Sequence, residues 1–489
     1  MTMTIRGRRL QPVIGLEIHV QLATHSKMFC GCGTEFDAPP NSLVCPVCLA
    51  FPGALPVPNR QAVALATRLA LAVGATVHPR SVFDRKSYYY PDLPKGYQIT
   101  QQRHPLATGG GIEVHGRRIE LERLHLEEDA GRSTHASGGA SLVDLNRAGV
   151  PLVEIVSRPQ LRTPEEAAAF MKEVRRIVRY LGVSDGNMEQ GSLRCDANIS
   201  LGDLDSDVPG ARVELKNINS FRFVTQALQH EIARHAEVLA AGGVVARETR
   251  SFDPQRGVSV FMRSKEDAHD YRFFPDPDLP PLVLDAQFIE AQRAQLVELP
   301  SARSARYQQD WGLSAQDAGV LTTDRATADW FERGVASIDP TPDHGARTKA
   351  LANLVIGEVT RLLKQQDRLI DSLPFGPERL VQLNDLVDSG VLSGDLALWV
   401  LGALWEADGD PAEIAVARGW RQVSDTAELD GVIAAVLSAH PAEAARYRAG
   451  QLKLRGFFVG RVMKETAGAA NPRLVNERLD ALLADGEPG

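Results

Sequence analysis

The chain has 489 residues, of which 44% are hydrophobic and 24% charged, and its formal net charge at pH 7 is -8. This is the composition of an ordinary globular protein of about two to four domains, and the charge argues against broad nonspecific binding to nucleic acid. No apolar run is long enough to span a membrane, and residues 1–7 lack the apolar core of a secretory signal. We therefore expect a cytoplasmic protein with no membrane contact.

Residues 13–22 alternate as a β-strand. The apolar residues at positions 16, 18, 20 and 22 share one face, and Glu17, His19 and Gln21 share the other. A strand that exposes a carboxylate and an imidazole beside a cysteine-rich loop indicates a site as well as a core.

Four of the five cysteines follow this strand as two close pairs, Cys30 with Cys32 and Cys45 with Cys48. Two such pairs can place four thiolates around one tetrahedral zinc ion. Two disulfides or four unrelated thiols are the alternatives, which a cytosolic composition disfavours. We therefore predict a closed zinc site.

Carboxylates recur at later strand positions. Residues 124–131 end a strand with three consecutive acids, and the pattern does not decide whether Glu127 or Glu128 faces the site. Glu154 lies in the apolar run 150–156, where burying a bare carboxylate is costly. With Glu17 and His19, and with Asp144 and Asn146, these residues form an oxygen-rich set with one imidazole, which suits Mg²⁺.

Residues 191–201 and 212–216 alternate as two strands around a turn-rich loop, which predicts an antiparallel hairpin buried on one side. Its open face carries Arg194, Asp196 and Lys216 among other polar residues. Helices are predicted after Thr163, which begins a capping box, and after Ser220. Hairpins with helices on one face favour an α+β fold over a doubly wound parallel sheet.

The composition becomes helical near residue 300, and a second break lies near residues 407–411. We predict an α+β domain with an antiparallel sheet over residues 1–295, an all-α domain over 296–410 and a small all-α tail domain over 411–489.

Cations accompany the carboxylates. Lys86 lies in a predicted loop rich in aromatic residues and prolines, and Arg194 and Lys216 lie on the hairpin. Cations beside carboxylate-held Mg²⁺ are what phosphoryl transfer needs, although surface ion pairing explains the composition equally well. No P-loop, no dinucleotide-binding glycine motif and no amidase-type Ser/Gly-rich run is present.

Motifs over nearly the whole chain carry a resemblance. They are residues 15–19, the four cysteines, and residues 51–56, 90–98, 125–131, 143–146, 191–198, 216–217, 271–279 and 456–472. With these motifs in this order, the chain resembles the B subunits of the tRNA-dependent amidotransferase, the GatB family.

The resemblance implies a first domain with a glutamine-synthetase-like fold and a glutamine-dependent carbon–nitrogen ligase. Such an enzyme uses ATP and Mg²⁺ to phosphorylate the side-chain carboxylate of misacylated Glu-tRNA(Gln) or Asp-tRNA(Asn). Ammonia then displaces the phosphate. The resemblance does not decide between the two tRNAs.

The resemblance also assigns residues. The metal and ATP ligands it implies are Glu17, His19, Glu128 and Glu154, with Asp196 and Glu189 as further candidates. The family often has two adjacent acids where this chain has Glu189 and Gln190. On chemical grounds we predict phosphate contacts from Lys86, Arg194 and Lys216.

Partners follow from the same resemblance. It implies a heterotrimer in which an amidase-type glutaminase (the A subunit) supplies ammonia and a small third protein (the C subunit) completes the assembly. The basic tail predicts a tRNA contact through Lys453, Arg455, Arg461 and Lys464, with a solvated helix face as the alternative. The competing function is a noncatalytic tRNA-binding scaffold, but the polar strand faces favour an enzyme.

Overall fold

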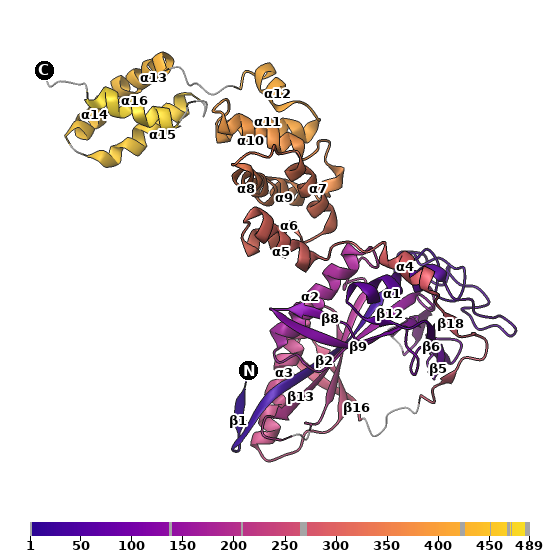
Figure 1. Ribbon diagram of the computed structural model, residues 1–489. Helices are drawn as coiled ribbons and strands as arrows, with labels where there is room; N and C mark the ends of the chain where they lie inside the picture. Colours follow the sequence, from indigo (N-terminus) through magenta and orange to yellow (C-terminus); the bar gives the residue numbers. More distant parts are fainter. Residues whose placement is uncertain are drawn as a thin grey trace. The chain divides into compact units, whose positions relative to one another are not determined.

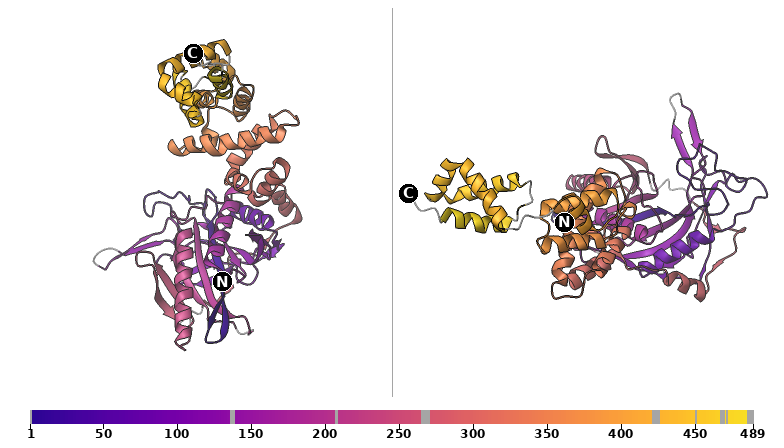
Figure 2. Two further views of the ribbon diagram at one scale, coloured as in Figure 1. Left: turned by 90° about the vertical axis from the view of Figure 1, so that its left-hand side faces the viewer. Right: turned by 90° about the horizontal axis from the view of Figure 1, so that it is seen from above.

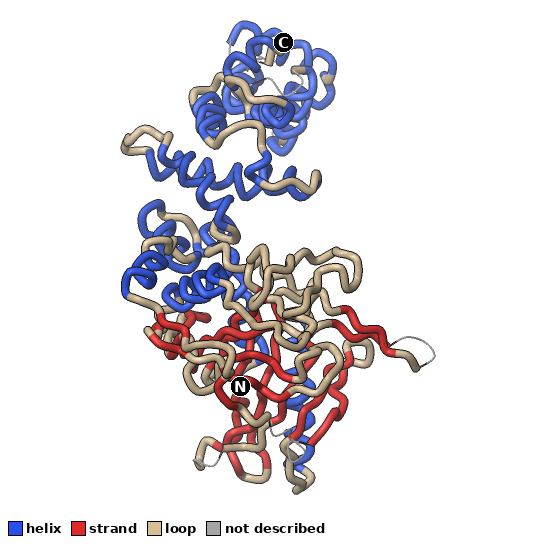
Figure 3. The backbone as a smooth tube through the Cα atoms, turned by 90° about the vertical axis from the view of Figure 1, so that its right-hand side faces the viewer, coloured by secondary structure: helices blue, strands red, loops and turns tan. Residues whose placement is uncertain are grey.

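The computed structural model describes residues 2–135, 139–206, 209–264, 271–420, 426–449, 451–466, 470 and 472–484. The chain divides into two compact units, Met1–Ser301 and Ala302–Gly489. The named strands of the described residues all lie in the first unit, whereas the second is built from helices (Figure 3). Within the described residues, no helix is both long enough and apolar enough to cross a membrane.

A large sheet organises the first unit. The strand order of its main path is β16 (Val258–Ser264), β15 (Glu248–Asp253), β14 (Val213–Ile218), β13 (Leu193–Asp203), β2 (Arg8–Gln21), β12 (Pro151–Ser157), β9 (Arg117–Glu128), β7 (Ala107–Thr108) and β3 (Thr76–Val77). β1 (Met3–Ile5) pairs with β2, and β8 (Gly111–Val114) pairs with β9. The long strand β2 is therefore central, between β13 and β12.

Helices cover one face of this sheet. α2 (Pro164–Tyr180) and α3 (Phe221–Ala240) pack against each other along it (Figure 1), and α1 (Arg60–Ala72) packs on β9, β12 and β3. The hydroxyls of Thr163 and Ser220 cap the first turns of α2 and α3, as the sequence predicted. Phe170 of α2 is fully buried with Ile18 of β2 in the main core. The opposite sheet face is left for polar residues.

Short strands flank the open face. β5 (Asp84–Ser87) and β6 (Tyr97–Thr100) pair with each other and, through β5, with β17 (Phe274–Pro275). β4 (Arg80–Ser81) pairs with β18 (Leu282–Val283), ahead of α4 (Ala286–Arg293). β10 (Arg132–His135) and β11 (Ser141–Asp144) form a hairpin that projects from the first unit (Figure 2).

The described residues of the second unit form two hydrophobic cores, of which the first includes Phe331 and Leu401 and the second Ile433 and Phe458. Its helices are α5 (Pro300–Trp311), α6 (Ala315–Leu321), α7 (Arg325–Ala336), α8 (His344–Leu354), α9 (Thr360–Gln365), α10 (Glu378–Asp388), α11 (Gly394–Glu406), α12 (Pro411–Ala417), α13 (Thr426–Ala439), α14 (Pro441–Arg448), α15 (Arg455–Glu465) and α16 (Pro472–Ala484). A π-helical turn, Val355–Val359, joins α8 to α9, and 3₁₀ turns lie at Ile370–Ser372 and Leu452–Leu454.

The prediction of an α+β first part followed by helical parts is confirmed. The large sheet is mixed rather than wholly antiparallel, because β14 and β15 pair in parallel. The predicted hairpin is present as β13 and β14, with the predicted buried face. The chain divides at residues 301/302, near the expected first boundary. α12 packs on α10 and α11 in the first helical core, so a boundary at residue 410 would separate α12 from its neighbours.

Replacing Phe170 by Ala should destabilise the first unit by about 3–5 kcal/mol, because a fully buried ring leaves a cavity between α2 and the sheet. Calorimetry measures the change. All five tryptophans lie in the second unit, so its tryptophan fluorescence transition should stay unchanged. Lys172→Ala, on the exposed side of the same helix, is the control and should cost less than about 0.5 kcal/mol. Equal effects of the two substitutions would contradict this packing.

Candidate active site and metal centre

Four polar side chains form a row across the open face of the sheet. In the strand register, His19 of β2 lies opposite Arg194 of β13 and Glu154 of β12, and Glu154 lies opposite His125 of β9. Alternation forces this arrangement, because the apolar residues between these positions face the helices. Residues from four strands far apart in the sequence thus meet on one surface.

A first group of metal-ligating atoms combines two members of this row, His19 and Glu154, with Glu127, which lies two residues after His125 on β9. His19, Glu127 and Glu154 each offer one ligand atom, and these atoms lie within 4.8 Å of one another. His19 Nε2 is 3.5 Å from Glu127 Oε1 and 3.5 Å from Glu154 Oε2. Two carboxylates and one imidazole are a suitable donor set for a divalent cation such as Mg²⁺.

Buried His125 lies behind this group, with its Nε2 3.3 Å from Glu154 Oε2 and 3.8 Å from Glu127 Oε2. Burial alone would lower the pKa of His125, but the two carboxylates outweigh burial and raise it to about 9. Burial likewise opposes the charge of Glu154, but His125 and His19 hold the pKa of Glu154 well below its usual range. The metal-free group is therefore held together by buried charge pairs.

A second group shares only β2 with the first and lies on the β13 and β14 side of it. Glu17 of β2, Asp196 of β13 and Glu214 of β14 offer ligand atoms within 4.8 Å of one another. Lys216 Nζ bonds to Asp196 and lies 3.0 Å from Glu214 Oε1. Burial, together with the carboxylates around it, raises the pKa of Glu17. These acids repel one another, and a cation among them relieves that repulsion.

The two neighbouring glutamates at the end of β9 have different surroundings. Strand pairing continues through Glu128, so alternation holds and places Glu127 beside His19. Glu128 instead bonds to Lys95 Nζ and accepts a hydrogen bond from the Ile99 backbone N–H at 3.0 Å. The expectation that Glu128 joins His19 and Glu154 is therefore corrected, and Glu127 takes that place.

Two further expectations are also changed by the structure. Glu189 is exposed in a turn after α2 and belongs to neither carboxylate group. Asp144 and Asn146 bind the cysteine loop instead of joining a metal group: Asn146 Oδ1 accepts from the Leu43 N–H at 2.9 Å. Asp144 Oδ1 accepts from the Asn41 N–H at 3.1 Å.

The predicted cations lie on or near the open face. Arg194 Nη2 is 2.7 Å from Asp129 Oδ2, and Asp129 is buried. Burial opposes the charge of Asp129, but Arg194 and Arg147 lower its pKa. Lys86 Nζ donates to Gln98 Oε1 at 3.1 Å. Sequence reasoning missed Asp129, and it placed Glu214 on the open face of the hairpin without naming it as a ligand.

Members of each carboxylate group line a cavity. A cavity of about 130 Å³ is lined by His19, Glu127 and Arg194, with Tyr88 and Gln98 at its side. A second cavity, of about 550 Å³, is lined by Glu17 and Asn198 together with the guanidinium side chains of Arg123, Arg212 and Arg247. The larger cavity combines positive charge with a carboxylate group and suits a phosphate-bearing ligand.

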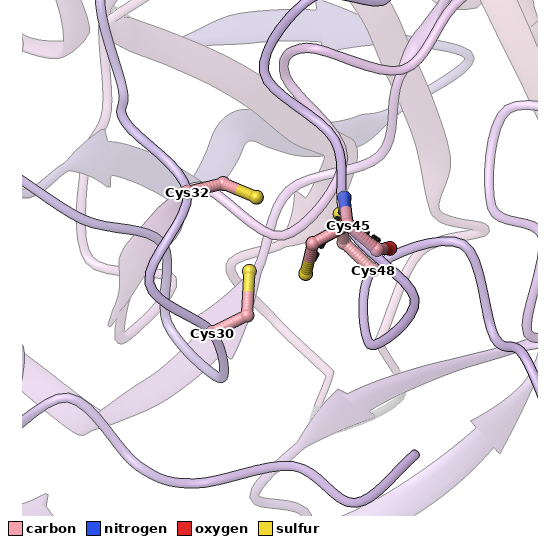
Figure 4. A group of neighbouring side chains, drawn as sticks. All are labelled: Cys30, Cys32, Cys45 and Cys48. Atoms are coloured by element: carbon pink, nitrogen blue, oxygen red, sulfur yellow. Dashed lines mark hydrogen bonds between the residues drawn. The ribbon is translucent and has the colours of Figure 1, made fainter. Parts of the chain in front are cut away.

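The four cysteines form a third group (Figure 4). Their sulfur atoms lie within 4.8 Å of one another, and Cys45 Sγ and Cys48 Sγ are 3.9 Å apart. Four sulfurs at about 2.3 Å from one zinc ion are separated by close to this distance, so the group fits tetrahedral zinc. The Cys45 backbone N–H donates to Cys48 Sγ at 3.1 Å, as expected for a thiolate in such a turn.

Comparison with known proteins shows which family the chain resembles. The family model described as the GatB/GatE catalytic domain matches residues 12–290, and one described as a GatB domain matches residues 338–483. The B subunit of the aspartyl/glutamyl-tRNA(Asn/Gln) amidotransferase of Geotalea daltonii is 49% identical over 475 residues, covering 96% of this chain and 98% of that protein. The same subunit of Anaeromyxobacter sp. (strain K) is 50% identical over 481 residues, covering 97% and 99%.

The chain belongs to the GatB family. The resemblance inferred from the motifs is thereby confirmed, and so is its class: an amidotransferase component, hence part of an enzyme. The GatB/GatE catalytic domain coincides with the unit that carries both carboxylate groups and the cysteines. The helical GatB domain begins inside the second unit.

The raised pKa of His125 predicts how the stability of the GatB catalytic unit depends on pH. A histidine whose pKa rises from 6.5 to about 9 on folding stabilises the protein below pH 6.5 and loses that effect as pH rises through 9. Without added divalent cations, the first unit should lose up to about 3 kcal/mol more stability between pH 6.5 and 9.5 in wild type than in His125→Gln.

Calorimetry of the first-unit transition measures this difference. His25→Gln, which changes an exposed histidine near the end of β2, should follow the wild-type pH dependence. The same pH dependence in wild type and His125→Gln would show that the buried proton is not on His125.

Proposed function

We propose that this chain phosphorylates the side-chain carboxylate of Glu or Asp on a misacylated tRNA and transfers ammonia to the activated acyl group. The observation that carries the proposal is the pair of carboxylate groups on one open sheet face, whose β2 members, Glu17 and His19, are two residues apart. The two groups are flanked by fixed cations and lie at cavities. Relatives named as the B subunit of an aspartyl/glutamyl-tRNA(Asn/Gln) amidotransferase support the substrate.

The ligand sets suggest two Mg²⁺ sites and one ATP. His19, Glu127 and Glu154 would hold one ion, and Glu17, Asp196 and Glu214 the other. Mg²⁺ supplies charge neutralisation for phosphate oxygens when it is bound. Arg123, Arg212 and Arg247, which line the larger cavity beside Glu17, are suited to contact the nucleotide phosphates.

The fixed cations have a defined part in this reaction. Lys216 is held by Asp196 and Glu214, and these acids outweigh burial and raise its pKa, so the ammonium stays charged. Arg194 is held by Asp129 at the smaller cavity. Both cations are thereby oriented before substrate binds, and they can stabilise negative charge that develops during phosphoryl transfer. Lys86, fixed on Gln98, is a more distant candidate.

The chemistry has two steps. A carboxylate oxygen of the aminoacyl side chain attacks the γ-phosphorus of ATP, and ADP leaves with an acyl phosphate formed. The nitrogen of ammonia then attacks the acyl carbon, and phosphate leaves with one ammonia proton while the amide remains. The first step is needed because a carboxylate is a poor electrophile, and phosphate gives it a good leaving group.

Partners complete the proposal. We expect a heterotrimer in the cytoplasm, in which an amidase-type glutaminase (the A subunit) releases ammonia from glutamine and a small C subunit joins the assembly. The names of the relatives, which designate the B subunit of an amidotransferase, support a multi-subunit enzyme. The four cysteines would hold a structural zinc ion, and the tail would hold tRNA.

Glu127→Gln should lower the rate of ADP formation with misacylated tRNA by about 10²–10³-fold, because it removes one negative ligand of the first group. The assay uses the complex with its partner subunits and Glu-tRNA(Gln), Asp-tRNA(Asn) or correctly charged tRNA. Glu113→Gln, an exposed glutamate of β8 in the same sheet, is the matched control and should keep the wild-type rate.

The outcomes separate the two functions. ADP formation stimulated by a misacylated tRNA in wild type identifies the kinase and names its substrate. An unchanged rate in Glu127→Gln would refute the role of the first group. Wild-type complex that binds tRNA but forms no ADP with any tRNA would mean that the chain is a scaffold.

Of the four predicted tRNA contacts in the tail, Lys453, Arg461 and Lys464 are exposed, whereas Arg455 is paired with Asp480 at 2.6 Å. Replacing the three with Ala should weaken tRNA binding and reduce the slope of log affinity against log salt by up to about three, roughly one per lost phosphate contact. Fluorescence anisotropy with labelled tRNA over a salt series measures both. Arg455→Ala is the control and should have the smaller effect; an unchanged slope in the triple variant would remove the tail from the contact.

A further inference from the structure

Lys27 is buried beside the cysteine group. Its side chain is 0% exposed, and among the described residues it is the only lysine in the buried class. It lies between the end of β2 and Cys30, and its backbone N–H donates to Cys32 O at 2.9 Å. Its Nζ lies 3.8 Å from Cys48 Sγ and 3.1 Å from the backbone oxygen of Leu145.

A buried ammonium is costly unless an opposite charge accompanies it. Within the described residues, no carboxylate oxygen lies within 4.0 Å of Lys27 Nζ. Glu128 is near, since both it and Lys27 flank Gly149, but Glu128 is engaged by Lys95 and by the Ile99 N–H. The nearest group to Lys27 Nζ that can carry a balancing negative charge is therefore Cys48 Sγ, at 3.8 Å.

We propose that Lys27 is the charge partner of a zinc tetrathiolate and donates a hydrogen bond to Cys48 Sγ, an inference that rests on the proposed zinc site. Zinc with four thiolates carries a net charge of about -2, which is unfavourable in a partly buried loop. One fixed ammonium halves this charge. Lys27 thus acts on the metal through Cys48 and is a positioning residue, not a ligand.

The possible chemical states of the cysteines differ in how well they balance the charge of Lys27. Two disulfides or four neutral thiols would leave its ammonium buried with only a carbonyl oxygen and a weak sulfur acceptor. A metal-held tetrathiolate supplies the missing charge. Lys27 also connects the cysteine group to residues 143–149 through Leu145 O, next to the contacts that Asn41 and Asn146 make there.

The test compares four full-length proteins in complex with their partner subunits: wild type, Lys27→Met, Lys27→Arg and the surface control Lys172→Met. Elemental analysis gives zinc per chain, and transfer of zinc to the chromophoric chelator 4-(2-pyridylazo)resorcinol gives the release rate. We expect Lys27→Met to release zinc at least about tenfold faster than wild type, and the other two variants to stay within about threefold.

A spectroscopic measurement distinguishes loss of the Lys27 charge from looser packing around the metal. In the cobalt-substituted protein, loss of the ammonium raises the energy of the sulfur electrons. The thiolate-to-cobalt charge-transfer band should therefore shift to longer wavelength in Lys27→Met and stay in place in Lys27→Arg. A loosened but still charge-compensated site would release zinc faster without this shift, and that result would overturn the proposal.

Two other results would also decide the matter. Zinc present in wild type and released from Lys27→Met at the wild-type rate would refute the role of Lys27 and leave the zinc site standing. A wild-type complex without zinc would refute the zinc site itself, whatever the kinase assay gives. If Lys27→Met does not fold, Lys27→Gln takes its place with the same expected tenfold change, and release at the wild-type rate would overturn the proposal.

Discussion

The candidate site depends on the register in which β12 pairs with β2 and β9. This register sets Glu154 directly opposite both His19 and His125. A shift of one residue would turn Glu154 into the helix-covered core and bring a valine or isoleucine to the site. The apolar face that packs on α1, α2 and α3 therefore fixes the chemistry of the other face. The same strand register therefore determines which side chains are buried on one side of the sheet and which ligand atoms meet on the other.

Charge balance is the second organising feature of this face. Each carboxylate group has its own cations: His125 lies behind the first, and Lys216 lies against the second. In the first group, the histidines lower the pKa of Glu127 and of Glu154 despite burial, because each cation favours the charged form of the acid beside it. Fixed ionised groups need little rearrangement when a cation or a phosphate arrives, which is the condition for electrostatic preorganisation.

Local patterns were enough to predict much of this arrangement. Alternation gave the polar face of β2 and of the hairpin, and capping residues gave the starts of α2 and α3, because these features depend only on near neighbours in the chain. The pattern left Glu127 and Glu128 undecided and the resemblance implied Glu128, whereas strand pairing with β12 continues through residue 128 and places Glu127 beside His19. Asp144 and Asn146 were misjudged because their partners lie about a hundred residues away, in the cysteine loop. In the tail, counting basic residues could not reveal that Arg455 and Arg478 are committed to acids.

The cysteine loop has little regular structure of its own to hold it in place. Between the end of β2 at Gln21 and the start of α1 at Arg60, the chain has no helix or strand, although every residue there is described. A segment of this length without regular structure has few backbone hydrogen bonds of its own and several exposed apolar side chains, among them Phe36, Phe51 and Leu55. Buried Met28 and Phe29 anchor part of the segment in the main core. Two further sets of contacts hold it: the four neighbouring cysteines and the hydrogen bonds to residues 143–149. Because those residues lead directly into β12, the strand that carries Glu154, loss of order in the loop would be felt at the carboxylate row. A metal held by the four cysteines, as proposed above, would thus support the register on which the carboxylate face depends.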